Sequence, residues 1–316
     1  RSEAVALGLA LAMFTPYYVW GVIGGPTSKP SDLPDAAALL RPFLASPDTS
    51  TDLKITYGDI LNHNSHQQPT PEQRMAMCDE ARALLAGIGA VDLTNLTAAS
   101  VYADTADSEA RHAMQAGRLD DADRLEREVY DLAEKVLARR PGDMRSMKNR
   151  ALAANLLGEI APARHAGAAA AQYADRAVQA GEDAVRFNPA DLGTWAYWIM
   201  GRDQVAERLF ERGEIEAAID EAHATLSLGD DKRLPSTLQP QLEETWFRLA
   251  WLEAASGRRA DAERTFAGGV KAAEESAKQF AEGNSMRVLT LARVPVRRAR
   301  FELVLGEAQG AFSRAT

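Results

Sequence analysis

Apolar residues recur at steps of three and four along most of the chain beyond residue 70. This spacing places the apolar side chains on one face of an α-helix and predicts amphipathic helices. One such stripe consists of Ala122, Leu125, Val129, Leu132, Ala133 and Val136. Gly, Pro, Asp and Asn residues separate the stripes and mark the helix ends. The predicted helices cover about residues 71–86, 93–116, 122–136, 143–157, 168–187, 191–212, 215–226, 243–256 and 258–270, and another begins at 285.

Residues 243–270 carry the most regular pattern. With Gly257 as the turn, the apolar face of the first helix carries Trp246, Leu249 and Ala250, and that of the second carries Ala262, Phe266 and Gly269. These positions resemble the signature of the tetratricopeptide repeat (TPR), a helix hairpin. A hairpin of this kind buries its apolar stripe only against further hairpins. The resemblance therefore implies an all-α TPR-like superhelix, a solenoid of antiparallel helix hairpins.

The turn glycines of the expected hairpins are unevenly spaced. They are Gly117, Gly158, Gly213, Gly257 and Gly306, at intervals of 41, 55, 44 and 49 residues. The standard repeat has about 34 residues. Longer helices and a loop at residues 160–167 account for the excess, so we expect an irregular solenoid over residues 71–316.

The first 25 residues form a separate segment. Residues 4–23 are twenty residues without a charge, and Pro16 interrupts this run. At about 1.5 Å per residue, a helix of that length crosses the hydrocarbon core of a bilayer, so we expect a membrane span. The alternatives are an apolar helix docked on the protein and a targeting segment processed at residues 10–12. The chain does not begin with Met, so we expect a membrane helix here to follow a further segment of a longer protein.

Residues 26–70 are expected to be a linker, because five prolines interrupt residues 26–50. Apolar positions alternate between residues 51 and 61 as in a strand, but a lone strand has no partner in a helical protein. We therefore expect irregular structure or a helical turn there. His63 and His66 can be drawn as metal ligands. Because no carboxylate or thiol lies at ligand spacing, we expect a polar loop and no metal.

The charge distribution disfavours nucleic acid as a partner. The net charge is −9, and residues 71–283 carry 37 acidic and 26 basic groups, whereas residues 284–316 carry two acidic and six basic groups. An acidic body repels a polyanion. The single cysteine, Cys78, excludes an internal disulfide framework and a cysteine-based zinc site. The sequence has no glycine-rich phosphate loop or GxSxG motif, so we expect no cofactor.

Candidate contact residues lie on the first helix of each hairpin, which lines the concave face of such repeats. Trp195 and Trp246 occupy packing positions and are expected in the core. Tyr197 and Trp251 fall off those positions, and Arg202 stands where the motif has a large aromatic residue. We expect these three residues to contact a protein or peptide ligand.

A basic stripe near the end of the chain is a second candidate surface. It consists of Arg287, Arg293, Arg297, Arg298 and Arg300. Such a stripe suits an acidic peptide, the acidic body of a second copy in self-association, or anionic lipid. The alternative is an ordinary solvated helix face.

Together these patterns indicate a non-catalytic scaffold for protein–protein interactions. In this interpretation residues 4–23 anchor the chain in a membrane, and residues 71–316 are the repeat or sensor part of a larger bacterial protein, on the periplasmic side. The alternative is a cytoplasmic assembly or adaptor subunit whose apolar N-terminal helix docks on a partner protein. His112, His165 and His223 lack a nucleophile or paired carboxylate nearby in the sequence, so we expect no catalytic site.

Overall fold

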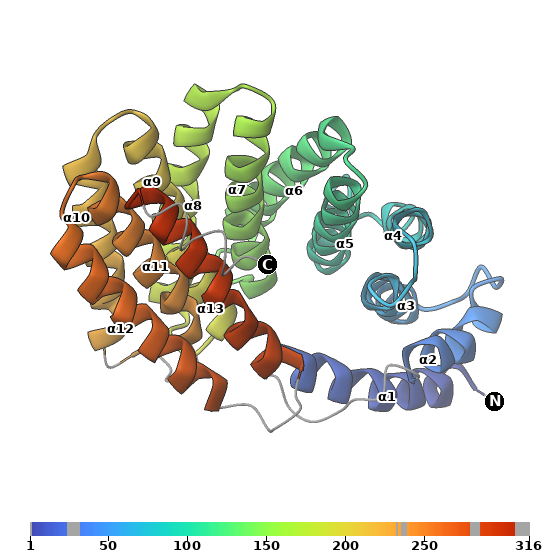
Figure 1. Ribbon diagram of the computed structural model, residues 1–316. Helices are drawn as coiled ribbons and strands as arrows, with labels where there is room; N and C mark the ends of the chain where they lie inside the picture. The colour runs from blue at the N-terminus through green and yellow to red at the C-terminus, as the bar shows by residue number, and fades with distance from the viewer. Residues whose placement is uncertain (1, 24–31, 232, 235–238, 279–284, 307–316) are drawn as a thin grey trace. The chain divides into compact units, whose positions relative to one another are not determined.

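Helices make up the regular structure of the computed structural model over the residues that it describes. The backbone is described for residues 2–23, 32–231, 233–234, 239–278 and 285–306, and the side chains for the same residues except 15–23, 239–241 and 285–289. Within these ranges no strand occurs, so the prediction of an all-α fold is confirmed. The chain divides into two compact units, Arg1–His165 (unit 1) and Ala166–Thr316 (unit 2). Figure 1 colours unit 1 from blue to green and unit 2 from yellow-green to red.

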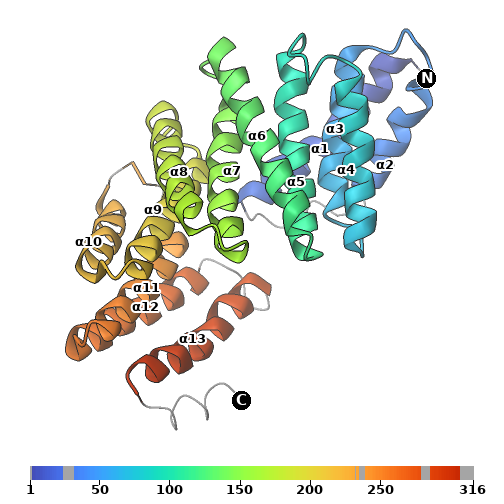
Figure 2. The ribbon, with the colours of Figure 1, turned by 90° about the horizontal axis from the view of Figure 1, so that it is seen from above.

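Unit 1 is built from helices that follow one another along the chain. They are α1 (Glu3–Ile23), α2 (Asp32–Leu40), the 3₁₀ turn η1 (Arg41–Phe43), α3 (Thr51–Ser65), α4 (Pro71–Ala86), α5 (Leu96–Gln115), α6 (Leu119–Arg139) and α7 (Met144–Ala163). Successive helices from α3 to α7 pack side by side, as Figure 2 shows. Helix α5 also contacts both α3 and α7, so it lies at the centre of the unit.

Helix α1 packs on unit 1 instead of standing apart. Its residues Ala6, Ala10 and Phe14 are buried in one cluster with side chains of α2 and α3. The helix continues to Ile23, so Pro16 does not end it. Among the described helices, none combines the length and the apolar character that a bilayer crossing requires. The expectation of a membrane span at residues 4–23 is therefore not supported.

Residues 51–65 form a regular helix, which corrects the expectation of irregular structure over residues 51–61. Ser50 caps α3 by accepting a hydrogen bond from the backbone nitrogen of Leu53. Leu53, Tyr57, Ile60 and Leu61 are all buried. Their spacing of four, three and one is helical, and this longer period outweighs the local alternation that indicates a strand. His63 lies in the last turn of α3 and not in a loop.

The turn between α7 and α8 also differs from the prediction. Gly158 is buried inside α7, which continues to Ala163, so the loop expected at 160–167 is mostly helix. The chain turns instead at His165, whose φ is +60°. Gly117, Gly213, Gly257 and Gly306 have φ values of +74° to +82° and are confirmed as turn residues. With His165 in place of Gly158, the turns lie 48, 48, 44 and 49 residues apart, a more regular repeat than the sequence indicates.

Unit 2 is also built from helices that follow one another along the chain. Its elements are α8 (Gly167–Phe187), α9 (Leu192–Glu211), α10 (Ile215–Leu226), the 3₁₀ turn η2 (Ser227–Asp230), α11 (Gln239–Ala255), α12 (Arg259–Lys278) and α13 (Ser285–Val304). Helix α9 packs on α8, α10 and α11, and α13 packs on α11 and α12. Trp195 is fully buried, as expected, and its indole nitrogen donates to the carbonyl oxygen of Pro189 at 2.8 Å. Trp246 is only half-buried, next to Gly268 and Gly269 of α12.

Candidate binding groove

A groove of about 600 Å³ lies on unit 2 where α9, α11 and α13 meet. Figure 1 shows α13 in red, lying across α11 and beside α12. The volume falls within the range of about 300–1,000 Å³ that is usual for ligand pockets. The apolar lining consists of Phe210, Phe247, Trp251, Leu252, Phe266, Phe301, Leu303 and Val304. The charged lining consists of Glu207, Glu211, Glu244, Arg248, Arg297 and Arg300.

The lining residues occupy one face of each helix. On α9 they are Glu207, Phe210 and Glu211, on α11 Glu244, Phe247, Arg248, Trp251 and Leu252, and on α13 Arg297, Arg300, Phe301, Leu303 and Val304. Most of these positions recur at steps of three or four residues, which places the side chains on one side of the helix. The same spacing links Phe247 to Trp251 and Arg297 to Phe301 in the sequence. This spacing could have identified Phe247 and Phe301 as lining residues from the sequence.

An aromatic cluster forms the base of the groove. Phe247 lies edge-on to Phe266 with 5.1 Å between ring centroids, and Phe266 stacks on Phe301 at 4.7 Å. These three side chains are buried. Phe210 and Trp251 form a further edge-to-face pair at 4.4 Å, but both are only half-buried. The groove therefore presents accessible aromatic surface above a packed aromatic base.

Arg297 connects α13 to the base of the groove. Its guanidinium pairs with both Glu243 and Glu244 of α11. The same guanidinium lies over the Phe247 ring, 4.5 Å from its centroid. Burial raises the pKa of Glu243, and the hydrogen bond from Arg297 opposes that rise. Arg297 is thus largely committed to holding α13 against α11.

Arg248 makes the corresponding connection to α9. Its Nη1 lies 3.3 Å from Glu207 Oε2, and its Nε lies 3.9 Å from Asp203 Oδ1. The Thr245 hydroxyl donates to Asp203 at 3.0 Å. Burial raises the pKa of Asp203 to about 6, against the attraction of Arg248. In contrast, Arg300 is exposed and forms no ion pair with the residues that the structure describes.

Of the six residues expected from the sequence to contact a partner, two line the groove: Trp251 and Arg297. Tyr197 lies half-buried on α9 outside the groove lining, and Arg293 is exposed on α13 outside it as well. The side chain of Arg287, from the basic stripe, lies outside the described residues.

The other two expected contact residues lie against neighbouring helices. They are Arg202 and Arg298. Arg202 Nε lies 2.7 Å from Glu221 Oε1 of α10, and both side chains are mostly buried. Arg298 lies over the Phe266 ring of α12, 5.1 Å from its centroid, and pairs with Glu302 of its own helix at 2.8 Å. Both arginines therefore link parts of unit 2 and do not line the groove.

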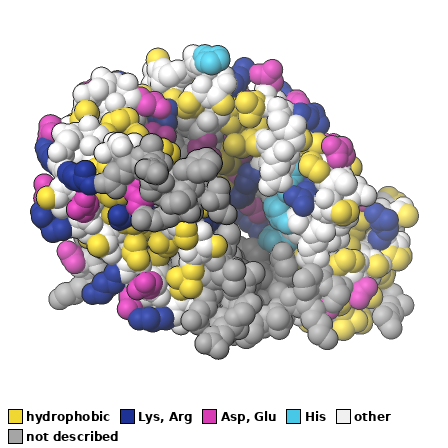
Figure 3. Space-filling view, in the orientation of Figure 1, with side chains coloured by type: hydrophobic (Ala, Val, Ile, Leu, Met, Phe, Trp, Pro, Cys, Tyr) yellow, Lys and Arg dark blue, Asp and Glu magenta, His cyan; other side chains and the backbone are white. Residues whose placement is uncertain are grey.

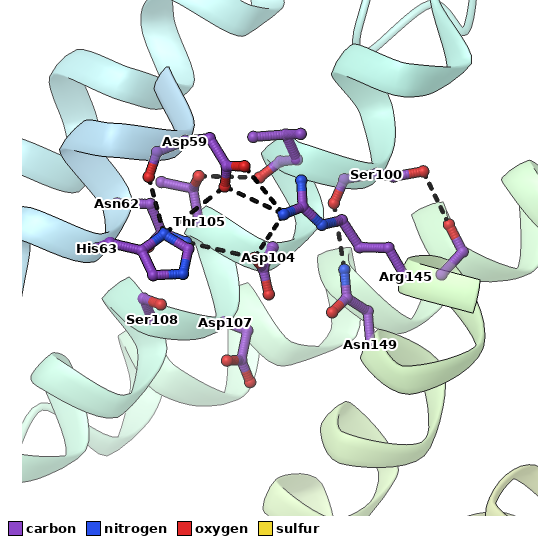
Figure 4. Close-up of polar contacts among 12 residues, drawn as sticks. Asp59, Asn62, His63, Ser100, Asp104, Thr105, Asp107, Ser108, Arg145 and Asn149 are labelled. Atoms are coloured by element: carbon purple, nitrogen blue, oxygen red, sulfur yellow. Dashed lines mark hydrogen bonds and ion pairs between the residues drawn. The ribbon is translucent and has the colours of Figure 1, made fainter. Parts of the chain in front are cut away.

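A polar cluster occupies the face of unit 1 where α3, α5 and α7 meet (Figure 4). Arg145 of α7 lies 3.0 Å from Asp59 of α3 and 3.9 Å from Asp104 of α5. Asn62 donates to Asp104 at 3.4 Å, and the His63 Nδ1 lies 2.9 Å from the Asp59 carbonyl oxygen. Arg145 lies between the two carboxylates, so the cluster joins the three helices that carry these side chains. Among the described residues, no group of three His, Cys, Asp or Glu side chains is placed to hold a metal ion.

The end of unit 2 carries further exposed apolar surface. Leu291, Val296, Leu303 and Val304 of α13 are exposed. In the space-filling view, apolar side chains in yellow gather over α12 and α13, with acidic and basic side chains bordering them (Figure 3). The apolar lining of the groove thus continues onto the outer side of α13 through Leu303 and Val304.

Comparisons with known proteins bear on the fold. No family model matches the sequence, and no curated protein matches it either. The crystal structure of BtubC (BKLC) from P. vanneervenii is similar, with a TM-score of 0.51 and 14% identity over 78% of this chain and 89% of that chain. A tetratricopeptide repeat protein from Parabacteroides merdae ATCC 43184 overlaps 98% of this chain and 90% of its own at 14% identity and a TM-score of 0.44. Human IFIT1 with m7Gppp-AAAA overlaps 96% of this chain and 75% of its own at 12% identity and a TM-score of 0.36. The helix hairpins and their turn residues show a TPR-like helical repeat fold, and the likeness to BtubC is a likeness of fold alone.

Proposed function

We propose that the chain is a non-catalytic interaction scaffold, and that the groove of unit 2 binds an apolar surface of a partner protein. The observation that supports this most is the half-buried pair of Phe210 and Trp251 inside the groove. Aromatic side chains that are held rigidly in a concave, partly exposed site are typical anchors of protein interfaces.

The chemistry of the groove lining favours binding over catalysis. The described part of the lining contains no Ser, Cys, His or Lys, the side chains that most often serve as nucleophiles or general bases. Its carboxylates Glu207 and Glu244 are paired with Arg248 and Arg297. These groups therefore stabilise one another and the helices that carry them.

The charge of the lining favours a protein partner over nucleic acid. Among the described residues, three glutamates and three arginines line the groove, so these groups sum to a formal charge of zero. Residues 71–283, which include four of these six groups, carry 37 acidic groups against 26 basic ones in all. Nucleic-acid affinity depends on an excess of basic groups that neutralise phosphates, and this excess is lacking.

Capture of partner proteins by the full chain tests the proposal. We expect a double variant, Phe210→Ser with Trp251→Ala, to lose at least about tenfold in affinity for a captured partner, because interface anchors contribute about 2 kcal/mol or more each. Phe187→Ser is the matched control, since Phe187 is exposed on α8 outside the groove lining. Circular dichroism checks that all variants fold. Equal capture by the folded double variant and the wild type would contradict the proposal.

A further inference from the structure

The two walls of the groove carry opposite charges. Among the residues whose side chains the structure describes, α9 contributes Glu207 and Glu211 as its charged lining residues, and α13 contributes Arg297 and Arg300. Helix α11, between them, contributes one residue of each sign, Glu244 and Arg248. An occupant of the groove therefore has an acidic wall on one side and a basic wall on the other.

Each charge on α11 pairs with a wall charge of opposite sign and offsets it. Arg248 pairs with Glu207 on the acidic wall, and Glu244 pairs with Arg297 on the basic wall. Glu211 remains half exposed, with its ion pair directed to Arg208 on its own helix. Arg300 is exposed and has no ion pair among the described residues. Glu211 and Arg300 are thus the wall charges most available to an occupant.

The walls are helices, and this limits the form of the occupant. Backbone donors and acceptors inside a helix are already paired, so an extended peptide finds no main-chain partner along these walls. An amphipathic helix satisfies its own backbone and needs only side-chain contacts. Its apolar stripe matches the aromatic lining, including the half-buried Phe210 and Trp251.

We infer that the groove selects an amphipathic helix of a partner protein whose apolar stripe has basic residues along one edge, facing Glu211, and acidic residues along the other, facing Arg300. This inference rests on the proposed function and specifies its ligand. The order of charges also sets the direction of the bound helix. A helix with its two charged edges exchanged fits only when it is turned end to end.

Three fluorescent synthetic peptides test the inference with the full chain. All are 18-residue amphipathic helices with the same Leu and Trp stripe, and their edges are mixed (Lys on one, Glu on the other), all Glu or all Lys. We expect the mixed peptide to bind about tenfold more tightly than either uniform peptide, because each uniform peptide sets like charges against one wall. Equal affinity for the three peptides, or no binding of any, overturns the inference.

Arg300→Glu replaces the available basic charge of the α13 wall with an acidic one and is expected to make the all-Lys peptide the tightest ligand. Arg293→Glu, on the same helix but outside the groove lining, is the matched control and should leave the order unchanged. If both variants keep the wild-type order, the charged walls do not select the ligand. A peptide with exchanged edges should bind in reverse, which a photoreactive group at its N-terminus detects through a change in the cross-linked residues.

Two other occupants are distinguished in the same experiment. Residues 307–316 follow α13 directly in the sequence, so a chain that ends at Gly306 is measured in parallel. If the mixed peptide binds the shortened chain but not the full chain, residues 307–316 compete for the groove, and the inference is overturned. Analytical ultracentrifugation shows whether a second copy of the chain occupies the groove. If the wild type is a dimer and Trp251→Ala makes it a monomer, the second copy is the occupant, and the inference is overturned. The three peptides can bind equally well while the variant of Phe210 and Trp251 still loses the captured partner. Failure of this inference is therefore distinguishable from failure of the proposed function.

Discussion

Glu126 of α6 lies beside Asp107 of α5, and both carboxyl groups are fully buried. Burial raises the pKa of Glu126 well above its usual value, and the negative charge of Asp107 adds to this rise. Burial also raises the pKa of Asp107, against the attraction of its ion-pair partner Arg111. The charges of Asp104 and Glu159 raise these pKa values further. Burial and the neighbouring Asp107 thus both favour the protonated form of Glu126 in the folded chain.

This pair makes the stability of unit 1 dependent on pH. Below the usual pKa of a glutamate, 4.5, Glu126 is protonated in both the folded and the unfolded chain. Above that pH the unfolded chain releases the proton while the folded chain retains it, so the free energy of unfolding falls as pH rises until Glu126 ionises in the folded state. Glu126→Gln keeps the size of the side chain and does not ionise. We expect it to flatten this decline in urea unfolding measured between pH 4 and pH 9.

Asp131→Asn is the control for this experiment, because Asp131 is exposed on the same helix. It removes one carboxylate without altering the buried pair. The expected result is a pH profile like that of the wild type. If Glu126→Gln and Asp131→Asn give the same profile, the buried pair does not cause the pH dependence.

Helices α8 and α9 approach so closely that two glycines are required between them. A Cβ atom on Gly181 would lie 2.6 Å from the Trp198 Cα, and one on Gly201 would lie 2.9 Å from the Val178 backbone nitrogen. Because backbone atoms cannot move aside without shifting a helix, Gly181→Ala is expected to destabilise unit 2 by about 1–3 kcal/mol. The better helix propensity of Ala offsets only about 0.5–1 kcal/mol of this.

Gly167→Ala provides the comparison, since Gly167 is also on α8 but has open space around its Cβ position. We expect this variant to unfold at the wild-type temperature or slightly above it. A Gly181→Ala protein with unchanged thermal unfolding would show that α8 and α9 separate easily.

Much of the fold follows from the sequence because the helix periodicity is strong. The turns at Gly117, Gly213, Gly257 and Gly306 were predictable, since each needs a positive φ that glycine adopts without strain. Gly158 indicated a turn in the sequence, but the structure has a continuous helix there. A glycine inside a helix costs only about 1 kcal/mol relative to alanine, and burial of the surrounding residues of α7 outweighs this cost. The turn at His165 uses a positive φ in a residue that rarely adopts one, so composition does not reveal it.

The groove was only partly predictable. Its lining depends on the face that each helix presents, and one sequence does not show how neighbouring helices are rotated. Arg202 illustrates this limit: its helix is predicted well, but its side chain pairs with Glu221 on α10. Trp251 falls off the packing positions of the repeat, and this does place it in the groove lining. Contacts between helices far apart in sequence, such as Arg297 with Glu243, require the folded chain.

Arg145 is expected to be the main electrostatic link of the polar cluster in unit 1. It is the cation between Asp59 and Asp104, with 24% of its side chain exposed. Removing one partner of a buried ion pair costs about 3–5 kcal/mol, and partial exposure reduces the expected loss for Arg145→Met to about 1–3 kcal/mol. Adding Asp59→Asn should restore part of that stability, because the uncompensated carboxylate is removed.

Urea unfolding of the two single variants and the double variant measures this coupling, which is expected to be about 0.5–3 kcal/mol. Arg124→Met serves as the control: Arg124 is exposed on α6 and forms only a long pair with Asp121. Its replacement should change stability by less than about 0.5 kcal/mol. Additive effects of Arg145→Met and Asp59→Asn would mean that the two side chains do not stabilise each other.

Phe301 is expected to hold α13, and with it the basic wall of the groove, on unit 2. It is buried and stacks on Phe266 at 4.7 Å, whereas the neighbouring Leu303 is exposed. Truncation of a buried phenylalanine costs about 3–5 kcal/mol, so Phe301→Ala should release α13 while α8 to α11 stay folded. Hydrogen exchange followed by mass spectrometry should then show faster exchange in α13 and slow exchange in α9. Leu303→Ala is the matched control and should leave exchange in α13 unchanged. Because the groove needs both walls, Phe301→Ala should also abolish binding of the mixed-edge peptide, and retention of that binding with α13 released would show that α9 and α11 suffice.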